Sequence, residues 1–239
     1  MENENDLKKI MRSHSERVLK MKLPIVLGID SNNKPKIIDL AKVGNILVGG
    51  ASGQGKTNLL RAIAKSCFYA PPKVYQGCIV YHIDSKGVEE FSPYFAIQLN
   101  ETDEIRKELE MLCDKISKRE SDKKISRYPI AVLIDDVDHL ILTDKSLLER
   151  IEYIAMRGPR VGIYMVLTTA RAECDILSMR LRAETPTRVA FRVASAVESR
   201  SIIYRPDATQ LTEKGEILFS HNGKLTRLQT INVIDNNGE

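Results

Sequence analysis

The segment from Gly50 to Thr57 limits the possible folds of this chain more than any other. It reads Gly-Ala-Ser-Gly-Gln-Gly-Lys-Thr, which fits the pattern of glycine, four residues, glycine, lysine and a hydroxyl residue. An apolar strand is expected just before it, at Asn45 to Val48, and a helix is expected from Lys56 to about Phe68. This order of strand, glycine-rich loop and helix is the context in which such a motif forms a phosphate-binding loop, or P-loop.

The P-loop predicts a nucleotide site for physical reasons. Glycines let backbone N–H groups approach phosphate oxygens closely, and the N-terminus of the following helix adds a partial positive charge. Lys56 is expected to reach the β- and γ-phosphates of ATP, and the Thr57 hydroxyl is expected to hold Mg²⁺. The predicted ATP-binding residues are Gly50, Ala51, Ser52, Gly53, Gln54, Gly55, Lys56, Thr57 and Asn58.

A second feature, Ile130 to Asp136, fits the same chemistry. Five apolar residues, Ile-Ala-Val-Leu-Ile, lead into Asp135 and Asp136. In open α/β folds ligands bind at the carboxyl ends of the strands, so this strand would deliver both carboxylates to the ligand side. We expect Asp135 to hold the magnesium ion with Thr57, and Asp136 to position or activate the attacking water.

Apolar strands that alternate with helices predict an α/β fold with a mostly parallel sheet and helices on both faces. Residues 1–22 are expected to form a helical extension that either docks on the domain or lies free, and 23–235 are expected to form the ATPase domain. The domain would begin with a hairpin at its N-terminal end. The other predicted elements are strands at 78–83, 162–168 and 189–193, helices at 103–120 and 145–156, and a break at Pro71-Pro72.

Composition excludes several classes of protein. The formal net charge of +4 over 239 residues permits binding to nucleic acid but does not argue for it. The four cysteines have spacings that fit neither a zinc site nor a disulfide framework. No apolar run approaches the ~20 residues of a membrane span, and no signal peptide is evident. These features predict a soluble, cytoplasmic protein.

Several further segments resemble the FtsK/SpoIIIE family of DNA-pumping ATPases, and the match extends over nearly all of residues 23–219. The similar segments are Leu23 to Gly28, Ile38 to Lys42, Val80 to Lys86 followed by Val88-Glu89, Arg160 to Ile163, Pro186 to Phe191, Ser199 to Ile203 and Lys214 to Leu218. The resemblance implies a RecA-like P-loop fold and a hexameric ring that threads duplex DNA through its channel while it hydrolyses ATP.

The resemblance also implies roles for certain arginines. The family has an arginine that resembles an arginine finger, a side chain that reaches the phosphate bound by the neighbouring subunit. Pro159 occupies the aligned position in this chain, and Arg157 and Arg160 lie on either side of it. The segment from Arg171 to Arg182 matches the family's channel loops. It offers Arg171, Arg180 and Arg182 to the DNA backbone, with Glu173 and Asp175 opposing them.

Two further departures from the family pattern leave alternatives open. Asp136 stands where the family usually has glutamate, and Ala170 stands where the family has a glutamine that would sense the γ-phosphate. The chain could therefore be a DNA translocase, a secretion-type ATPase that moves proteins, or a weakly active module whose nucleotide state controls assembly. Few aromatic residues are present, which favours duplex DNA over single strands.

Three remaining features are interpreted as structural. The stretch from Lys118 to Arg127, which includes Arg119, is expected to be a basic, solvated loop. His82 lies in a strand that is expected to be buried, and His139 follows the carboxylates. No nucleophile or set of metal ligands converges on either histidine in sequence.

Overall fold

The computed structural model describes residues 4–69, 78–87, 97–125, 128–171 and 177–233. The break predicted at Pro71-Pro72 and the similar dipeptide Val88-Glu89 lie outside the described residues, as do Arg127, Glu173 and Asp175. None of the described helices has both the length and the apolar character that a membrane span requires.

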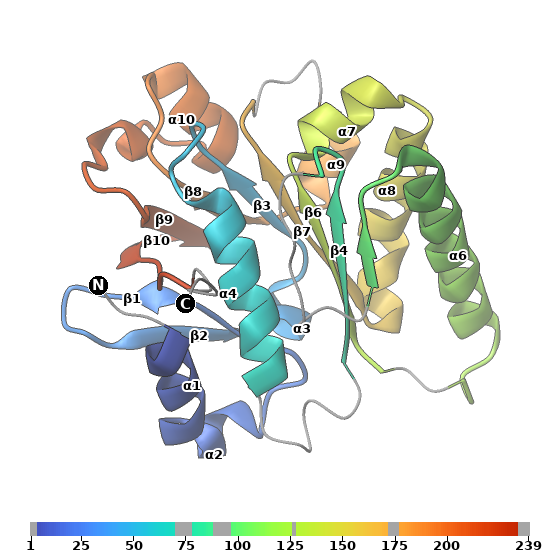
Figure 1. Ribbon diagram of the computed structural model, residues 1–239, viewed down its shortest axis with the longest axis horizontal. Coiled ribbons are helices and arrows are strands. Elements are labelled where there is room, and N and C mark those ends of the chain that lie inside the picture. The colour runs from blue at the N-terminus through green and yellow to red at the C-terminus, as the bar shows by residue number, and fades with distance from the viewer. Residues whose placement is uncertain (1–3, 70–77, 88–96, 126–127, 172–176, 234–239) are drawn as a thin grey trace, which may run out of the picture.

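The described chain alternates between helices and strands for most of its length (Figure 1). The strands are β1 (Pro24–Ile29), β2 (Pro35–Asp39), β3 (Ile46–Gly49), β4 (Ile79–Asp84), β5 (Ile97–Leu99), β6 (Ile130–Asp135), β7 (Ile163–Thr169), β8 (Thr187–Ala190), β9 (Glu216–His221) and β10 (Lys224–Gln229). The α-helices are α1 (Glu4–Ser13), α2 (Ser15–Val18), α3 (Leu40–Val43), α4 (Lys56–Tyr69), α6 (Thr102–Ser121), α7 (Val137–Thr143), α8 (Leu147–Arg157), α9 (Met179–Ala183) and α10 (Ala196–Ile203). Two 3₁₀ turns, η1 (Gly158–Val161) and η2 (Asp207–Gln210), complete the described elements.

All of these strands belong to one sheet, in the order β2-β1-β10-β9-β8-β3-β7-β6-β4-β5. The strands from β8 to β5 in this order pair in parallel, and β9, β10, β1 and β2 extend one side of the sheet through antiparallel pairs. The predicted α/β fold with a mostly parallel sheet is confirmed. The predicted hairpin is also confirmed, because β1 and β2 pair antiparallel.

The apolar run in β6 faces two cores. Val132 and Ile134 join the core that contains α6 and α8, whereas Ala131 and Leu133 join the core that contains α4. Because successive side chains of a strand point to opposite faces, a strand covered on both sides must be apolar throughout. Figure 1 shows α4 lying across the sheet, apart from the pair formed by α6 and α8.

The N-terminal helices dock on the sheet domain rather than lying free. Leu7, Met11 and Val18 are fully buried, in a third apolar cluster that also contains Ala62 of α4 and Val233 near the other end of the described chain. The amphipathic spacing of α1 therefore serves packing within the same body.

The prediction of a basic loop from Lys118 to Arg127 is wrong for its first residues, because α6 continues to Ser121. Arg119 is buried, and its guanidinium donates to the carbonyl oxygens of Val161 and Tyr128, each at 3.0 Å. This arginine joins α6 to η1 and to the start of β6, so its charge is not offered to a ligand. No sequence pattern predicted α3, α7, α9, α10, β5, β9 or β10 as separate elements.

A substitution in α1 tests the docking. Met11→Ala is expected to lower the free energy of unfolding by about 2–5 kcal/mol, because it removes a fully buried side chain. The matched control is Leu19→Ala, since Leu19 is 46% exposed and its loss should change stability by no more than about 0.5 kcal/mol. Urea unfolding monitored by circular dichroism gives both values, and equal values would contradict a docked helix.

Candidate nucleotide-binding site

The P-loop leaves the carboxyl end of β3 and leads directly into α4. Strand β8 holds the loop on one side, because the Phe191 amide donates to the Gly49 carbonyl at 2.8 Å and the Ala51 amide donates to the Arg192 carbonyl at 3.0 Å. A Cβ atom on Gly50 would lie only 2.5 Å from the Cβ of Phe191, so only glycine fits there. Gly53 adopts a φ of 75°, in the left-handed region that glycine tolerates.

Lys56 begins α4 and folds back over the loop. Its ammonium donates to the carbonyl oxygens of Gly50 at 2.9 Å and Ala51 at 3.1 Å. Burial lowers the pKa of Lys56, while the charges of Asp136 and Asp135 oppose that change. The ammonium group therefore lies among backbone oxygens and close to both carboxylates, where it can interact with an anionic phosphate.

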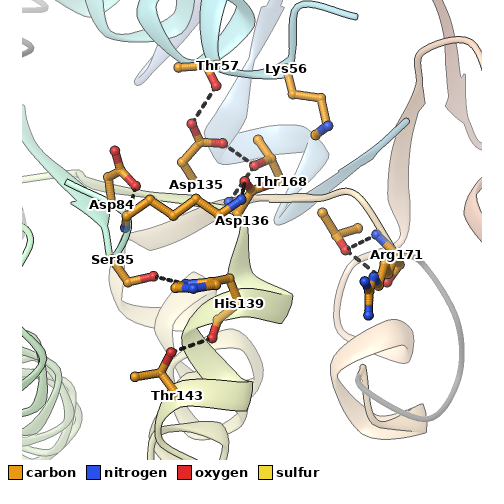
Figure 2. A network of polar contacts seen from close by, with 12 residues as sticks. Lys56, Thr57, Asp84, Ser85, Asp135, Asp136, His139, Thr143, Thr168 and Arg171 are labelled. Atoms are coloured by element: carbon orange, nitrogen blue, oxygen red, sulfur yellow. Dashed lines mark hydrogen bonds and ion pairs between the residues drawn. The ribbon is translucent and has the colours of Figure 1, made fainter. Parts of the chain in front are cut away.

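Asp135 is the centre of a buried network that joins three elements (Figure 2). Its Oδ2 accepts from the Thr57 hydroxyl of α4 at 2.6 Å, and its Oδ1 accepts from the Thr168 hydroxyl of β7. Burial raises the pKa of Asp135, and the two hydroxyl donors act in the opposite direction. The structure thus brings together Thr57 and Asp135, the two residues that the sequence assigns to a metal ion.

Asp136 follows Asp135 with a left-handed backbone, at φ 47° and ψ 59°. Its amide donates to the Thr168 hydroxyl at 2.8 Å, so one hydroxyl group contacts both aspartates. Its carboxylate forms an ion pair with Lys86, which comes from the turn after β4. Sequence analysis did not assign a role to Lys86, although it lies in a segment that resembles the family.

A cavity of about 730 Å³ opens beside the P-loop. One wall consists of residues 52–58 with Arg61 and Asp136, and the other consists of residues 213–215 with Ile29, Gln229, Thr230 and Asn232. The volume is in the range of small-molecule sites. Sequence analysis did not predict the second wall, and the only signal for it was the similar segment at Lys214 to Leu218.

Asn58 joins the two walls of the cavity. Its side-chain amide donates to the Ile231 carbonyl at 2.8 Å, and its side-chain oxygen accepts from the Val233 amide at 2.9 Å. Gly215 forms a second link, because its amide donates to the Gln54 carbonyl at 3.1 Å. The predicted ligand residue Asn58 therefore also positions the chain opposite the P-loop.

The residues present fit a magnesium ion that arrives with a nucleotide. Thr57 and Asp135 already place two oxygens 2.6 Å apart at the start of α4. No group of three or more His, Cys, Asp or Glu side chains among the described residues could hold a metal ion. Mg²⁺ requires six oxygen ligands and commonly takes several from phosphates and water, which is compatible with a protein share of two.

Comparison with known proteins decides the family. A sequence model of the FtsK/SpoIIIE family matches residues 6–125, half of the chain. The chain belongs to the FtsK/SpoIIIE family. DNA translocase SftA of Bacillus subtilis (strain 168) is 30% identical over 254 residues, which cover 94% of this chain and 26% of SftA. DNA translocase FtsK of Haemophilus influenzae is 26% identical over 264 residues, which cover 91% of this chain and 50% of that protein.

This FtsK/SpoIIIE chain therefore spans about a quarter to a half of the length of these relatives. Solved structures support the same fold. The pCW3 conjugation coupling protein TcpA with ATPγS has a TM-score of 0.77 at 22% identity, covering 90% of this chain and 68% of that one. The type VII secretion ATPase EccC of Thermomonospora curvata has a TM-score of 0.75 at 19% identity, covering 91% and 29%.

The two arginines that the FtsK/SpoIIIE resemblance assigns to a finger lie far from their own P-loop. Arg157 ends α8 and Arg160 lies in η1, just before the amino end of β7, whereas the P-loop follows the carboxyl end of the parallel strand β3. Arg157 is held by Glu120 through two contacts, at 3.0 and 2.8 Å. Arg160 is exposed. Neither arginine can contact a nucleotide bound at the P-loop of the same chain.

The three arginines that the family resemblance assigns to DNA have different surroundings. Arg171 is exposed, and its backbone is fixed by the Thr169 hydroxyl at 2.9 and 3.0 Å. Arg180 on α9 is exposed and lies 3.4 Å from Glu152. Arg182 is half-buried and donates to the Ser201 carbonyl at 2.7 Å.

The two histidines singled out in the sequence have different surroundings. His139 on α7 contacts the Ser85 hydroxyl at 2.9 Å, next to the Lys86 turn (Figure 2). His82 is fully buried in β4, where burial lowers its pKa to about 4 and the charge of Arg61 contributes to the change. His82 is therefore neutral in the folded protein at physiological pH.

The low pKa of His82 predicts a loss of stability in acid. The folded-state pKa lies below the ordinary value of 6.5, so stability present above pH 6.5 is lost as the pH falls toward 4. Between pH 7.5 and pH 5, His82 becomes protonated in the unfolded chain but stays neutral in the folded protein. This difference should lower the free energy of unfolding by about 2 kcal/mol. His82→Gln should lose less stability than the wild type by that amount over this interval, because glutamine does not titrate. Urea unfolding at both pH values gives the comparison, and identical losses in the two proteins would refute a buried neutral histidine.

Proposed function

We propose that this protein is an ATP-hydrolysing motor that translocates duplex DNA as a homo-hexamer. The observation that carries the proposal is the network of Thr57, Asp135, Thr168 and Asp136, at the edge of a cavity whose other parts are the P-loop and Lys56. Such an arrangement suits phosphoryl transfer, because positioning and electrostatic stabilisation supply nearly all of the catalysis.

In the proposed reaction, the oxygen of a water molecule attacks the γ-phosphorus of ATP. The bond between that phosphorus and the bridging oxygen of ADP breaks and the water gives up a proton, so the products are ADP, inorganic phosphate and a proton. Asp136 lines the cavity and would orient the water, while Lys56 would stabilise the charge on the phosphates. Mg²⁺, held by Thr57 and Asp135, would neutralise phosphate charge when it is bound with ATP.

The relatives support DNA as the substrate. Both SftA of Bacillus subtilis and FtsK of Haemophilus influenzae are DNA translocases by name. Arg171 and Arg180 are exposed cations that could contact a DNA backbone, and Arg182 would contribute less because its guanidinium is engaged by Ser201. A hexamer would repeat the exposed pair six times around one channel, and such contacts would be independent of DNA sequence.

Steady-state ATP hydrolysis with and without linear duplex DNA tests the proposal. Hydrolysis should rise several-fold with DNA, and the stimulation should fall as salt rises from about 50 to 200 mM because phosphate contacts release counterions. The Lys56→Ala variant should lose hydrolysis under every condition. Measurable ATP binding with background hydrolysis, unchanged by DNA, would contradict a motor and favour a nucleotide-controlled assembly module.

A second prediction separates the two finger candidates. Because Glu120 already holds Arg157, Arg160 is the residue that we propose reaches the phosphate of a neighbouring subunit. Arg160→Ala should lower kcat by about 10³-fold or more. The matched control Arg157→Ala should change mainly stability, through the lost contact with Glu120.

Mixing two inactive proteins tests whether Arg160 acts between subunits. Lys56→Ala subunits carry an intact Arg160, and Arg160→Ala subunits carry an intact P-loop. Mixed assemblies should recover part of the hydrolysis that each variant lacks alone. Wild-type turnover by Arg160→Ala would eliminate this residue as the finger.

A further inference from the structure

Lys86 contacts the candidate catalytic carboxylate from a neighbouring strand. The register of β4 and β6 places Asp84 directly beside Asp135, so the turn that follows β4 lies next to Asp136. The Lys86 ammonium donates to the Asp136 Oδ2. The contact raises the pKa of Lys86, because the neighbouring carboxylate favours the charged ammonium.

The turn that carries Lys86 is itself well fixed. The Lys86 amide donates to the Asp84 Oδ1 at 3.0 Å, and the Gly87 amide donates to the Asp84 carbonyl at 3.2 Å. Gly87 adopts a φ of 62°, in the left-handed region that glycine tolerates. The backbone of Lys86 is therefore tied to the end of β4, and its side chain needs only to extend toward Asp136.

Lys86 approaches Asp136 from outside the nucleotide cavity. Asp136 is one of the residues that line the cavity, whereas Lys86 is not among them. The side chain of Lys86 is 41% exposed and that of Asp136 is 20% exposed. Lys56 lines the cavity and Lys86 does not, although the charge of Lys86 is near enough to Lys56 to contribute to its lowered pKa. The contact that the structure shows for the Lys86 ammonium is therefore with Asp136.

The ion pair with Lys86 can fix the direction of the Asp136 carboxylate, because the Asp136 side chain is short. The Asp136 backbone is fixed in a left-handed conformation by the bond from its amide to Thr168. The direction of the carboxylate then depends on two side-chain torsions, and an ion pair through one oxygen limits them. Among the residues that the structure describes, no hydrogen bond engages the second oxygen, which can accept one from a water molecule.

We propose that Lys86 is a positioning residue for ATP hydrolysis, which holds Asp136 in the orientation that binds the attacking water. This inference rests on the proposed ATPase function and adds to it a residue that acts only through Asp136. A misplacement of about 1 Å at a catalytic group can lower the rate about 10²-fold, so the effect should be large.

Hydrolysis kinetics of four variants test the inference. Lys86→Met should lower kcat about 10²-fold and change KM for ATP by less than about 2-fold, because binding groups in the cavity remain. Lys86→Arg, which keeps the charge, should recover most of kcat. Lys86→Gln is a second variant in case the methionine disturbs folding. The matched control is Lys145→Met, which removes an exposed lysine from the loop between α7 and α8.

A double-mutant cycle with Asp136→Asn shows whether Lys86 acts through Asp136. In the Asp136→Asn protein, whose residual turnover can be followed with radiolabelled ATP, Lys86→Met should cause no further loss. Circular dichroism and the affinity for a fluorescent ATP analogue should match the wild type in every variant.

Three results would overturn the inference while leaving the proposed ATPase intact. They are wild-type kcat in Lys86→Met and Lys86→Gln, an increase in KM at unchanged kcat, and equal losses from Lys86→Met with Asp or Asn at position 136. Absence of hydrolysis from the wild-type protein, with and without DNA, would instead overturn the proposed function and the role of Lys86 with it.

Discussion

One hydroxyl group, that of Thr168, determines how the site is assembled. It donates to the Asp135 carboxylate and accepts from the Asp136 amide, while Asp135 in turn accepts from Thr57 at the start of α4. Strand β7, strand β6 and the P-loop helix are therefore joined through bonds around one buried carboxylate. A buried carboxylate without these donors would be strongly destabilising, so the network and the packing of the three elements depend on each other.

The sequence could predict the parts of this site that are local. The P-loop, the β3 strand before it and the apolar β6 strand that ends in two aspartates are each encoded within a few residues, and the structure brings them together. The opposite wall of the cavity depends on Gly215 and Thr230, which reach the P-loop through antiparallel pairing of β8, β9, β10 and β1. No local sequence pattern encodes such pairing. The contact of Lys86 with Asp136 could not be predicted either, because the two residues are 50 positions apart and only the fold brings them together.

Charge counted along a sequence is a poor measure of charge available at a surface. Arg119 was predicted in a solvated loop, yet it is buried and bonds to two backbone carbonyls. In the sequence, Arg171 and Arg182 are equivalent members of one group of arginines. In the structure, the guanidinium of Arg182 donates to a carbonyl of α10, whereas Arg171 is exposed. Arginine has five donors on a long stem, so it often closes helix ends and loops. Only the fold separates these arginines from those that can meet a ligand.

The second wall of the cavity has a consequence for protein synthesis. The P-loop is complete once residue 57 has been made, but its partners at 213–215 and 229–232 are made more than 150 residues later. Contacts so distant in sequence form late, because the intervening chain must be ordered first. The cavity is therefore complete only after residue 232 has left the ribosome, and a nascent chain cannot enclose a nucleotide before its C-terminal strands have joined the sheet.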